Sequence, residues 1–124
     1  MDINIYNDLF NDFKLLNDQY NIVVNDLKND PIDNDNPYNL PLENMIKNTI
    51  SIIKYNSMVL ELINKLESID KSYTKKYKEQ FNGDLLQKPK LPQIFILFRK
   101  LINNLNKENY EECNRLKNKI LTKY

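Results

Sequence analysis

The residues that could do covalent chemistry are few in this sequence, and Cys113 is the first to consider. A thiol becomes a nucleophile when a neighbouring base or cation favours its thiolate form, and Glu112 and Arg115 lie nearby in the chain. The chain has no histidine, the side chain that most often serves as the base in such a pair. A cysteine can also behave as a small apolar side chain in a helix contact, a role that needs no reactivity. We therefore predict a packing role for this thiol.

Carboxylates and metal ligands are no better arranged for chemistry. Glu111 and Glu112 are adjacent on an expected helix, where their side chains diverge by about 100 degrees, so they do not form a facing acid–base pair. Asp33 and Asp35 superficially resemble a calcium loop, but Asn44 stands where the closing glutamate would be. With one glycine in the chain, a phosphate-cradling loop is also excluded. We expect no catalytic residue, cofactor, metal or small-molecule substrate.

Composition indicates one globular domain over residues 1–124. The 124 residues are 41% hydrophobic and 28% charged, which is ordinary for a compact domain. One cysteine excludes an internal disulfide, which favours a reducing compartment, the cytoplasm or alternatively the nucleus. The longest apolar run, residues 94–98, has five members, against the roughly 20 that a membrane helix needs. We predict no membrane insertion.

Charge is distributed unevenly along the chain. Residues 1–44 hold nine Asp and Glu against two Lys, whereas the rest holds eight acidic against sixteen basic residues. One interpretation is that the acidic segment lies against the basic helices or that both are solvated faces; the other is that the basic part forms a surface for an acidic partner such as RNA. Tyr73 and Tyr77 interleave with lysines, as in some nucleic-acid-binding surfaces, but also continue a helical stripe. The candidate basic patch consists of Lys71, Lys75, Lys76, Lys78, Lys88 and Lys90.

The first element expected is a long acidic amphipathic helix over residues 3–29. Its apolar residues recur at alternating steps of three and four: Tyr6, Leu9, Phe13, Leu16, Tyr20, Val23 and Leu27. Phe10, Leu15 and Val24 widen this stripe toward the width of a core-facing helix. Two interpretations are open: the stripe packs on the rest of its own domain, or it docks on a partner helix.

The rest of the sequence predicts a loop followed by a helical bundle. Residues 30–41 contain three prolines and form the loop, and residues 42–124 form the helical bundle. Residues 42–82 fit one long helix, or two with a break at the polar stretch 55–57. A connector around Gly83 leads to an apolar helix opened by Pro92. Asn109, with Glu112 three residues later, has the spacing of a capping box for a last helix. The fold class predicted is all-α, an antiparallel bundle of four to five helices.

Residues 91–121 carry a pattern of proline, spaced apolar residues, a polar residue before an aromatic, a small residue and a further apolar residue. The positions are Pro92, Ile94, Phe95, Phe98, Leu101, Leu105, Asn109, Tyr110, Cys113 and Leu116. This pattern resembles the helical domain shared by the steroid receptor RNA activator protein and the C-terminus of the large outer-coat subunit of COPII vesicles. The resemblance covers about half the chain; the connector here is longer, and the chain stops where members continue into a fifth helix. It implies an antiparallel bundle used for protein contacts, with a weaker RNA connection and no active site.

These features together favour a non-catalytic protein–protein interaction module, such as an adaptor, scaffold or coat-like subunit. The partner would be another protein or a second copy of the chain, met through the stripe of the first helix. The alternative is an RNA-binding or transcription-related protein that uses the basic C-terminal two-thirds.

Overall fold

The computed structural model describes residues 1–28, 42–69 and 91–124, and every regular element in these ranges is helical. The helices are α1 (Ile3–Lys28), α2 (Leu42–Leu66), α4 (Gln93–Asn106) and α5 (Tyr110–Lys123). The predicted all-helical class is therefore confirmed. The expected loop over residues 30–41, the connector around Gly83 and all six lysines of the candidate basic patch lie outside the described residues.

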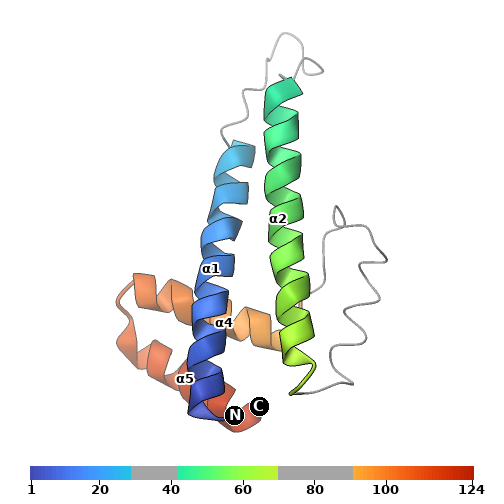
Figure 1. The fold of residues 1–124 in the computed structure, drawn as a ribbon. Helices are drawn as coiled ribbons and strands as arrows, with labels where there is room; N and C mark the ends of the chain where they lie inside the picture. Colours follow the sequence, from blue (N-terminus) through green and yellow to red (C-terminus); the bar gives the residue numbers. More distant parts are fainter. Residues whose placement is uncertain (29–41, 70–90) are drawn as a thin grey trace.

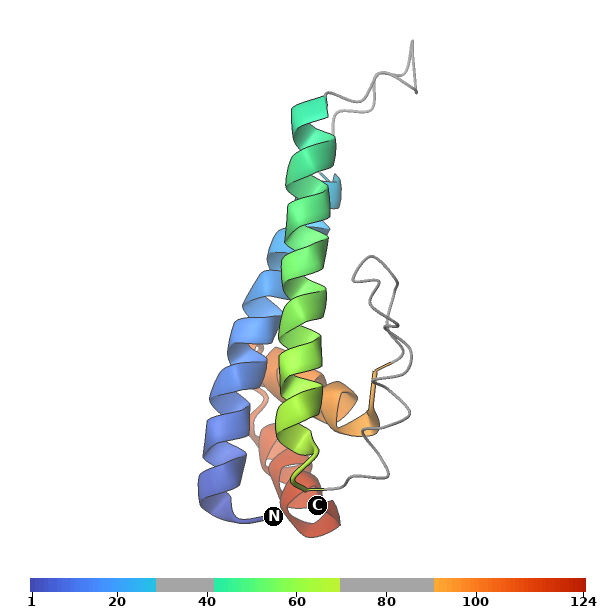
Figure 2. The ribbon, with the colours of Figure 1, turned by 45° about the vertical axis from the view of Figure 1, so that its right-hand side comes forward.

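Helices α1 and α2 run antiparallel, side by side, and form a hairpin (Figures 1 and 2). Helix α4 crosses behind the N-terminal half of α1 and the C-terminal half of α2, and α5 folds back beneath α4. The other ends of α1 and α2 extend beyond α4 and α5 in both views. The hairpin therefore has a half packed against α4 and a projecting half.

The two ends of the chain lie next to one another at the packed end of the molecule (Figure 1). The amino group of Met1 donates a hydrogen bond to the carbonyl oxygen of Leu121 at 2.9 Å. A positive group at the C-terminal end of a helix interacts favourably with the partial negative charge of the unpaired carbonyls there. This contact ties the start of α1 to the end of α5.

Aromatic rings form the centre of the core, where α1 crosses α4. Phe98 is fully buried, and its ring stacks on Phe13 at 4.4 Å and on Tyr6 at 5.7 Å between centroids. Phe95 meets Phe13 edge to face at 4.8 Å. Apolar residues of α2 and α5 complete this core, with Ile63 and Ile120 almost entirely buried. The apolar stripe of α1 and the apolar side chains of α4, the helix after Pro92, thus cover each other.

Helix α2 is continuous through residues 55–57, so the alternative with a helix break there is wrong. Tyr55 and Asn56 are buried within this continuous helix. The hydroxyl of Tyr55 accepts a hydrogen bond from Arg99 of α4 at 3.0 Å. The sequence pattern suggests a helix break at residues 55–57 because it does not show the partner of Tyr55. That partner, Arg99, lies on another helix, 44 positions away.

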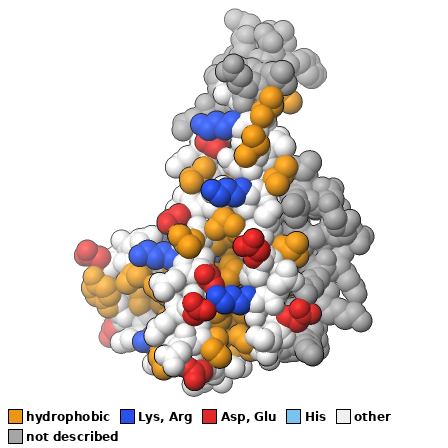
Figure 3. Space-filling view, viewed as in Figure 1, with side chains coloured by type: hydrophobic (Ala, Val, Ile, Leu, Met, Phe, Trp, Pro, Cys, Tyr) orange, Lys and Arg blue, Asp and Glu red, His pale blue; other side chains and the backbone are white. Residues whose placement is uncertain are grey.

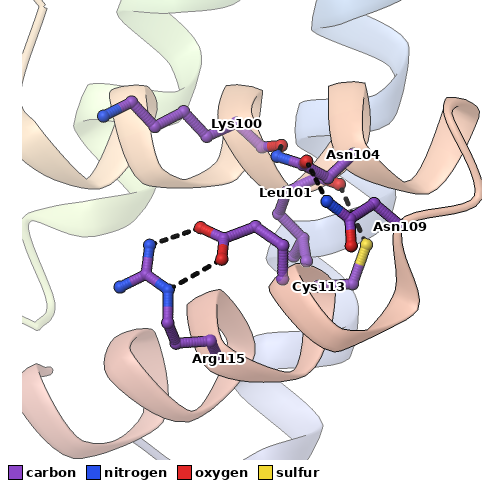
Figure 4. A network of polar contacts seen from close by, with 7 residues as sticks. Lys100, Leu101, Asn104, Asn109, Cys113 and Arg115 are labelled. Carbon is purple, nitrogen blue, oxygen red and sulfur yellow. Dashed lines mark hydrogen bonds and ion pairs between the residues drawn. The ribbon is translucent and has the colours of Figure 1, made fainter.

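The turn between α4 and α5 is closed by backbone geometry. Glu108 has a φ of 59°, the left-handed conformation common after a helix C-terminus, and the amide of Asn109 donates to the carbonyl of Asn104 at 2.9 Å. Asn109 is the N-cap residue of α5, but its side chain makes no cap hydrogen bond. Its amide nitrogen instead donates to Asn104 Oδ1 at 3.4 Å, and Glu112 pairs with Arg115 (Figure 4). The predicted capping box is therefore wrong, because both side chains are engaged elsewhere.

Candidate interaction surface

The apolar stripe of α1 divides after Leu16. Tyr6, Leu9, Phe13 and Leu16 are between 1% and 5% exposed and belong to the core of the chain. Tyr20, where the projecting half of the hairpin begins, is 36% exposed, and Val23, one turn further, is partly buried. The side chain of Leu27 lies outside the described residues. The first four positions thus pack within the chain, and the part of the stripe nearest to solvent begins at Tyr20.

Tyr20 belongs to a cluster that joins three helices. The guanidinium of Arg99 in α4 lies 4.5 Å from the centroid of the Tyr20 ring, and the Tyr55 ring of α2 lies 5.8 Å from it. Burial raises the pKa of Tyr55, while the charge and hydrogen bond of Arg99 act in the opposite direction. A cation over an aromatic face is attracted by the ring quadrupole. This cluster holds the hairpin against α4 at the point where its projecting half begins.

Charged side chains pair across the two hairpin helices near both ends. Lys65 Nζ of α2 lies 2.8 Å from Asp8 and 2.6 Å from Asp12 of α1, and these hydrogen bonds raise the pKa of Lys65. At the projecting end, the hydroxyl of Ser51 donates to Asp26 at 2.9 Å, and Lys47 lies 3.6 Å from the same carboxylate. Ion pairs with exposed lysines contribute little energy, and these contacts link α1 to α2 near both ends of the hairpin.

Between these pairs lies a shallow hollow, open on the side of the hairpin away from α4. It has a volume of about 260 Å³, and its lining consists of Asp12, Leu15, Met58, Glu61, Leu62 and Lys65. The floor is apolar and the rim carries both signs of charge. In α1, Leu15 is 61% exposed, although its neighbour Leu16 is only 4% exposed. Leu15 therefore does not widen the core stripe as expected, because it points to the outer edge of the contact with α2.

Large apolar side chains continue along the same side of the hairpin. Ile22 follows Leu15 by two helical turns, and Ile50 precedes Met58 by about two turns, so each pair shares a face of its helix. Figure 3 shows hydrophobic side chains down this side, interrupted by acidic and basic ones. We call this surface the hairpin face; its residues are Leu15, Ile22, Ile50, Lys54, Met58 and Glu61. Ile22 is 48% exposed and Ile50 is 61% exposed.

The projecting end of α2 carries two more exposed apolar side chains. Met45 is 48% exposed and Ile46 is 51% exposed. The sequence assigned Met45, Ile46 and Ile50 to the apolar stripe of a bundle helix, but in α2 the core side of the helix is occupied only from Tyr55 onward. Among the described helices, α4 covers the hairpin only over its packed half (Figure 2), whereas Ile50 lies on the hairpin face, which points away from α4.

Cys113 and Glu112, the residues considered above for covalent chemistry, each contact another residue of the chain. Cys113 Sγ is partly buried and donates to the carbonyl oxygen of Leu101 at 3.6 Å, which links α5 to α4 (Figure 4). The carboxylate of Glu112 faces Arg115, whose hydrogen bonds lower the pKa of Glu112. In the part of the chain that the structure describes, no group of three His, Cys, Asp or Glu residues could hold a metal ion.

Comparisons with known proteins add no relative. No family model, no curated protein and no solved structure matches this chain. None of the described helices is long and apolar enough to cross a lipid bilayer.

Proposed function

We propose that this protein is a non-catalytic interaction module that binds an amphipathic helix of another protein chain on its hairpin face. The observation that carries the proposal is the exposure of Leu15, Ile22 and Ile50 along one side of a hairpin whose opposite side is packed on α4. Contiguous exposed apolar surface with a polar rim is typical of protein contact sites.

A helix in a groove is the binding mode that fits this surface. The hollow between α1 and α2 offers Leu15 and Met58 as an apolar floor, and a side chain seated there would be shielded from water. Glu61 and Lys65 at its rim offer one acceptor and one donor that orient the bound helix. Apolar anchors in such pockets usually dominate the binding energy, while rim charges mainly determine orientation and rate.

The proposal retains an antiparallel bundle and the adaptor, scaffold or coat-like role implied by the resemblance of residues 91–121. In this arrangement α1 completes the bundle through Leu9 and Phe13, which pack in the core, and the hairpin face remains for the partner. A reducing compartment is part of the proposal, with the cytoplasm preferred to the nucleus, since Cys113 is a free thiol.

Nucleic-acid binding is the less supported alternative. Several cations of the C-terminal helices already contact other side chains: Arg99 lies over Tyr20, Arg115 pairs with Glu112, and Lys117 lies 5.5 Å from the Tyr6 ring. Phosphate binding would have to compete with these contacts. We expect no saturable binding of single-stranded RNA at about 50 mM salt, where phosphate contacts are strongest.

Site-specific photocrosslinking in the cells of origin tests the proposed function. Ile50 is replaced by a benzoyl-phenylalanine residue, and Lys119, exposed on α5, carries the same probe as a control position. We expect an adduct from position 50 whose mapped peptide is an amphipathic helical segment, and no such adduct from position 119. Leu15→Asp, placed in the hollow, is expected to abolish the adduct because it buries a charge against the bound helix.

Two results of the crosslinking experiment would contradict the proposed function. Either position 50 gives no adduct with any polypeptide, or its adducts persist unchanged in Leu15→Asp. Far-ultraviolet circular dichroism of each variant confirms that the helices are intact, as expected for exposed substitutions.

A further inference from the structure

On the basis of the proposed function, we infer that the helix bound on the hairpin face is α2 of a second copy of this chain, packed antiparallel about a twofold axis near Ser57 and Met58. The inference rests on two opposite charges of the hairpin face, Lys54 and Glu61. Both are exposed, and within the described ranges neither has a hydrogen bond or an ion pair.

Lys54 and Glu61 are placed for reciprocal pairing. Seven residues apart, they project from the same side of α2, offset by about 20 degrees and separated by about 10 Å along its axis. Their midpoint falls between Ser57 and Met58. A twofold axis through that point sets Lys54 of each copy opposite Glu61 of the other. A parallel pairing in the same register would instead oppose Lys54 to Lys54, which is repulsive.

The same twofold axis also places an exposed apolar side chain of each copy against the hollow of the other copy. Ile50 lies as far before the midpoint as Lys65 lies after it, so Ile50 of each copy faces the rim of the other copy's hollow. There it can contact Leu15 and Met58, and the stem of Lys65 can cover it. Ile50 is 61% exposed in the single chain, and this contact would remove it from water. One operation therefore pairs both charges and fills both hollows, as an isologous interface requires.

The charge balance of the surroundings also favours a second copy over a strongly charged partner. Of the other charges on this side of the hairpin, Lys65 pairs with Asp8 and Asp12, and Lys47 pairs with Asp26, while the exposed Asp18 lies between Leu15 and Ile22 on α1. A face that carries both signs of charge can be complementary to itself, and its excess of carboxylates over lysines makes it a poor surface for a polyanion.

Charge reversal tests the inference on the full-length chain by sedimentation equilibrium over a range of protein concentrations. We expect the wild type to dimerise. Lys54→Glu alone and Glu61→Lys alone should each weaken dimerisation by about tenfold or more, because one substitution turns two attractive pairs into two repulsive ones. The double variant K54E/E61K should regain most of the wild-type affinity, since both pairs are restored with reversed polarity.

Matched charge changes away from the face serve as controls. Lys14→Glu lies on another side of α1, and Glu111→Lys lies on α5; both residues are exposed, and both variants should dimerise like the wild type. A wild type that stays monomeric at about 200 µM, well above the dissociation constants typical of specific complexes, overturns the inference. A dimer that K54E/E61K does not rescue overturns it as well.

The outcomes separate this inference from the proposed function. A monomeric chain whose residue 50 crosslinks to an amphipathic helix of a different protein refutes the second copy and leaves the interaction module standing. A monomeric chain without any adduct at residue 50 refutes both.

Discussion

Tyr6 shows how a residue of the α1 stripe serves the core and at the same time carries a titratable group. Its ring is 5% exposed and stacks on Phe98, and its burial raises the pKa of the Tyr6 phenol to about 12. The phenol is neutral when protonated, so the folded state favours the protonated form relative to the unfolded chain, where the pKa is about 10. Tyr6 therefore stabilises the fold fully below pH 10 and loses this contribution as the pH rises toward 12.

A comparison of Tyr6→Phe with the wild type tests this titration. Between about pH 9.5 and 12 the wild type should lose on the order of 2 kcal/mol more of its unfolding free energy than Tyr6→Phe does, because only the wild type must deprotonate this phenol. Urea unfolding followed by circular dichroism measures the difference at each pH. Tyr110→Phe, at a position 62% exposed, should retain the wild-type pH dependence. Parallel pH profiles for Tyr6→Phe and the wild type would show that the phenol is not buried as described.

Arg99 is the residue whose role was least visible in the sequence. It appears there as one cation in a mostly apolar helix, whereas in the fold it lies over the Tyr20 ring and donates to the hydroxyl of Tyr55. Neither tyrosine is near it in sequence, and the cluster depends on where α4 crosses the hairpin. A local pattern contains no signal for such a contact.

At the scale of the helix, α1 separates two leucines that are neighbours in sequence. Leu16 is 4% exposed and packs in the core, whereas Leu15 is 61% exposed beside the hollow. Successive residues on a helix point about 100 degrees apart, so only one of the two can face α4. The division explains why the apolar stripe of α1 is buried at Leu9, Phe13 and Leu16 but does not extend to Leu15.

The two leucines provide a matched pair of substitutions. Leu16→Ala should lower the unfolding free energy by about 2–5 kcal/mol, the cost of a cavity in a packed core. Leu15→Ala should change the unfolding free energy of the monomer by less than about 0.5 kcal/mol, as is usual for surface substitutions. Chemical denaturation of dilute protein measures both. Similar losses for the two variants would mean that α1 is rotated about its axis relative to this description.

At the scale of the whole molecule, the described part of the chain packs α4 against only half the length of the hairpin. Helix α4 packs on it up to the cluster of Tyr20, Tyr55 and Arg99, and beyond this cluster the described residues that contact α1 and α2 are mainly those of the hairpin itself. Local stability follows the number of buried apolar contacts around each helical turn. The projecting half should therefore open more readily than the packed half.

Amide hydrogen exchange measures this gradient. We expect amides in residues 6–16 and 55–66 to exchange at least about tenfold more slowly than those in residues 21–26 and 44–52, because opening the packed half exposes the aromatic core. The measurement is made at low protein concentration, so that association on the hairpin face does not protect α2. Uniform protection along both helices would indicate that the projecting half is supported as well as the packed half.

The sequence by itself determined that the chain is helical and which side of α1 is apolar, because the spacing of apolar residues along a helix depends only on 3.6 residues per turn. It left open whether that side packs within the chain or on a partner. It also located the boundaries of α1 and the start of α5 to within about one residue. Only the tertiary structure decided that α2 continues through Tyr55, that Leu15 and Ile50 remain exposed, and that Lys54 and Glu61 face outward without partners in the described chain. The physical reason is that burial on one helix depends on where a second helix crosses it, and the crossing of α4 is a property of the assembled core.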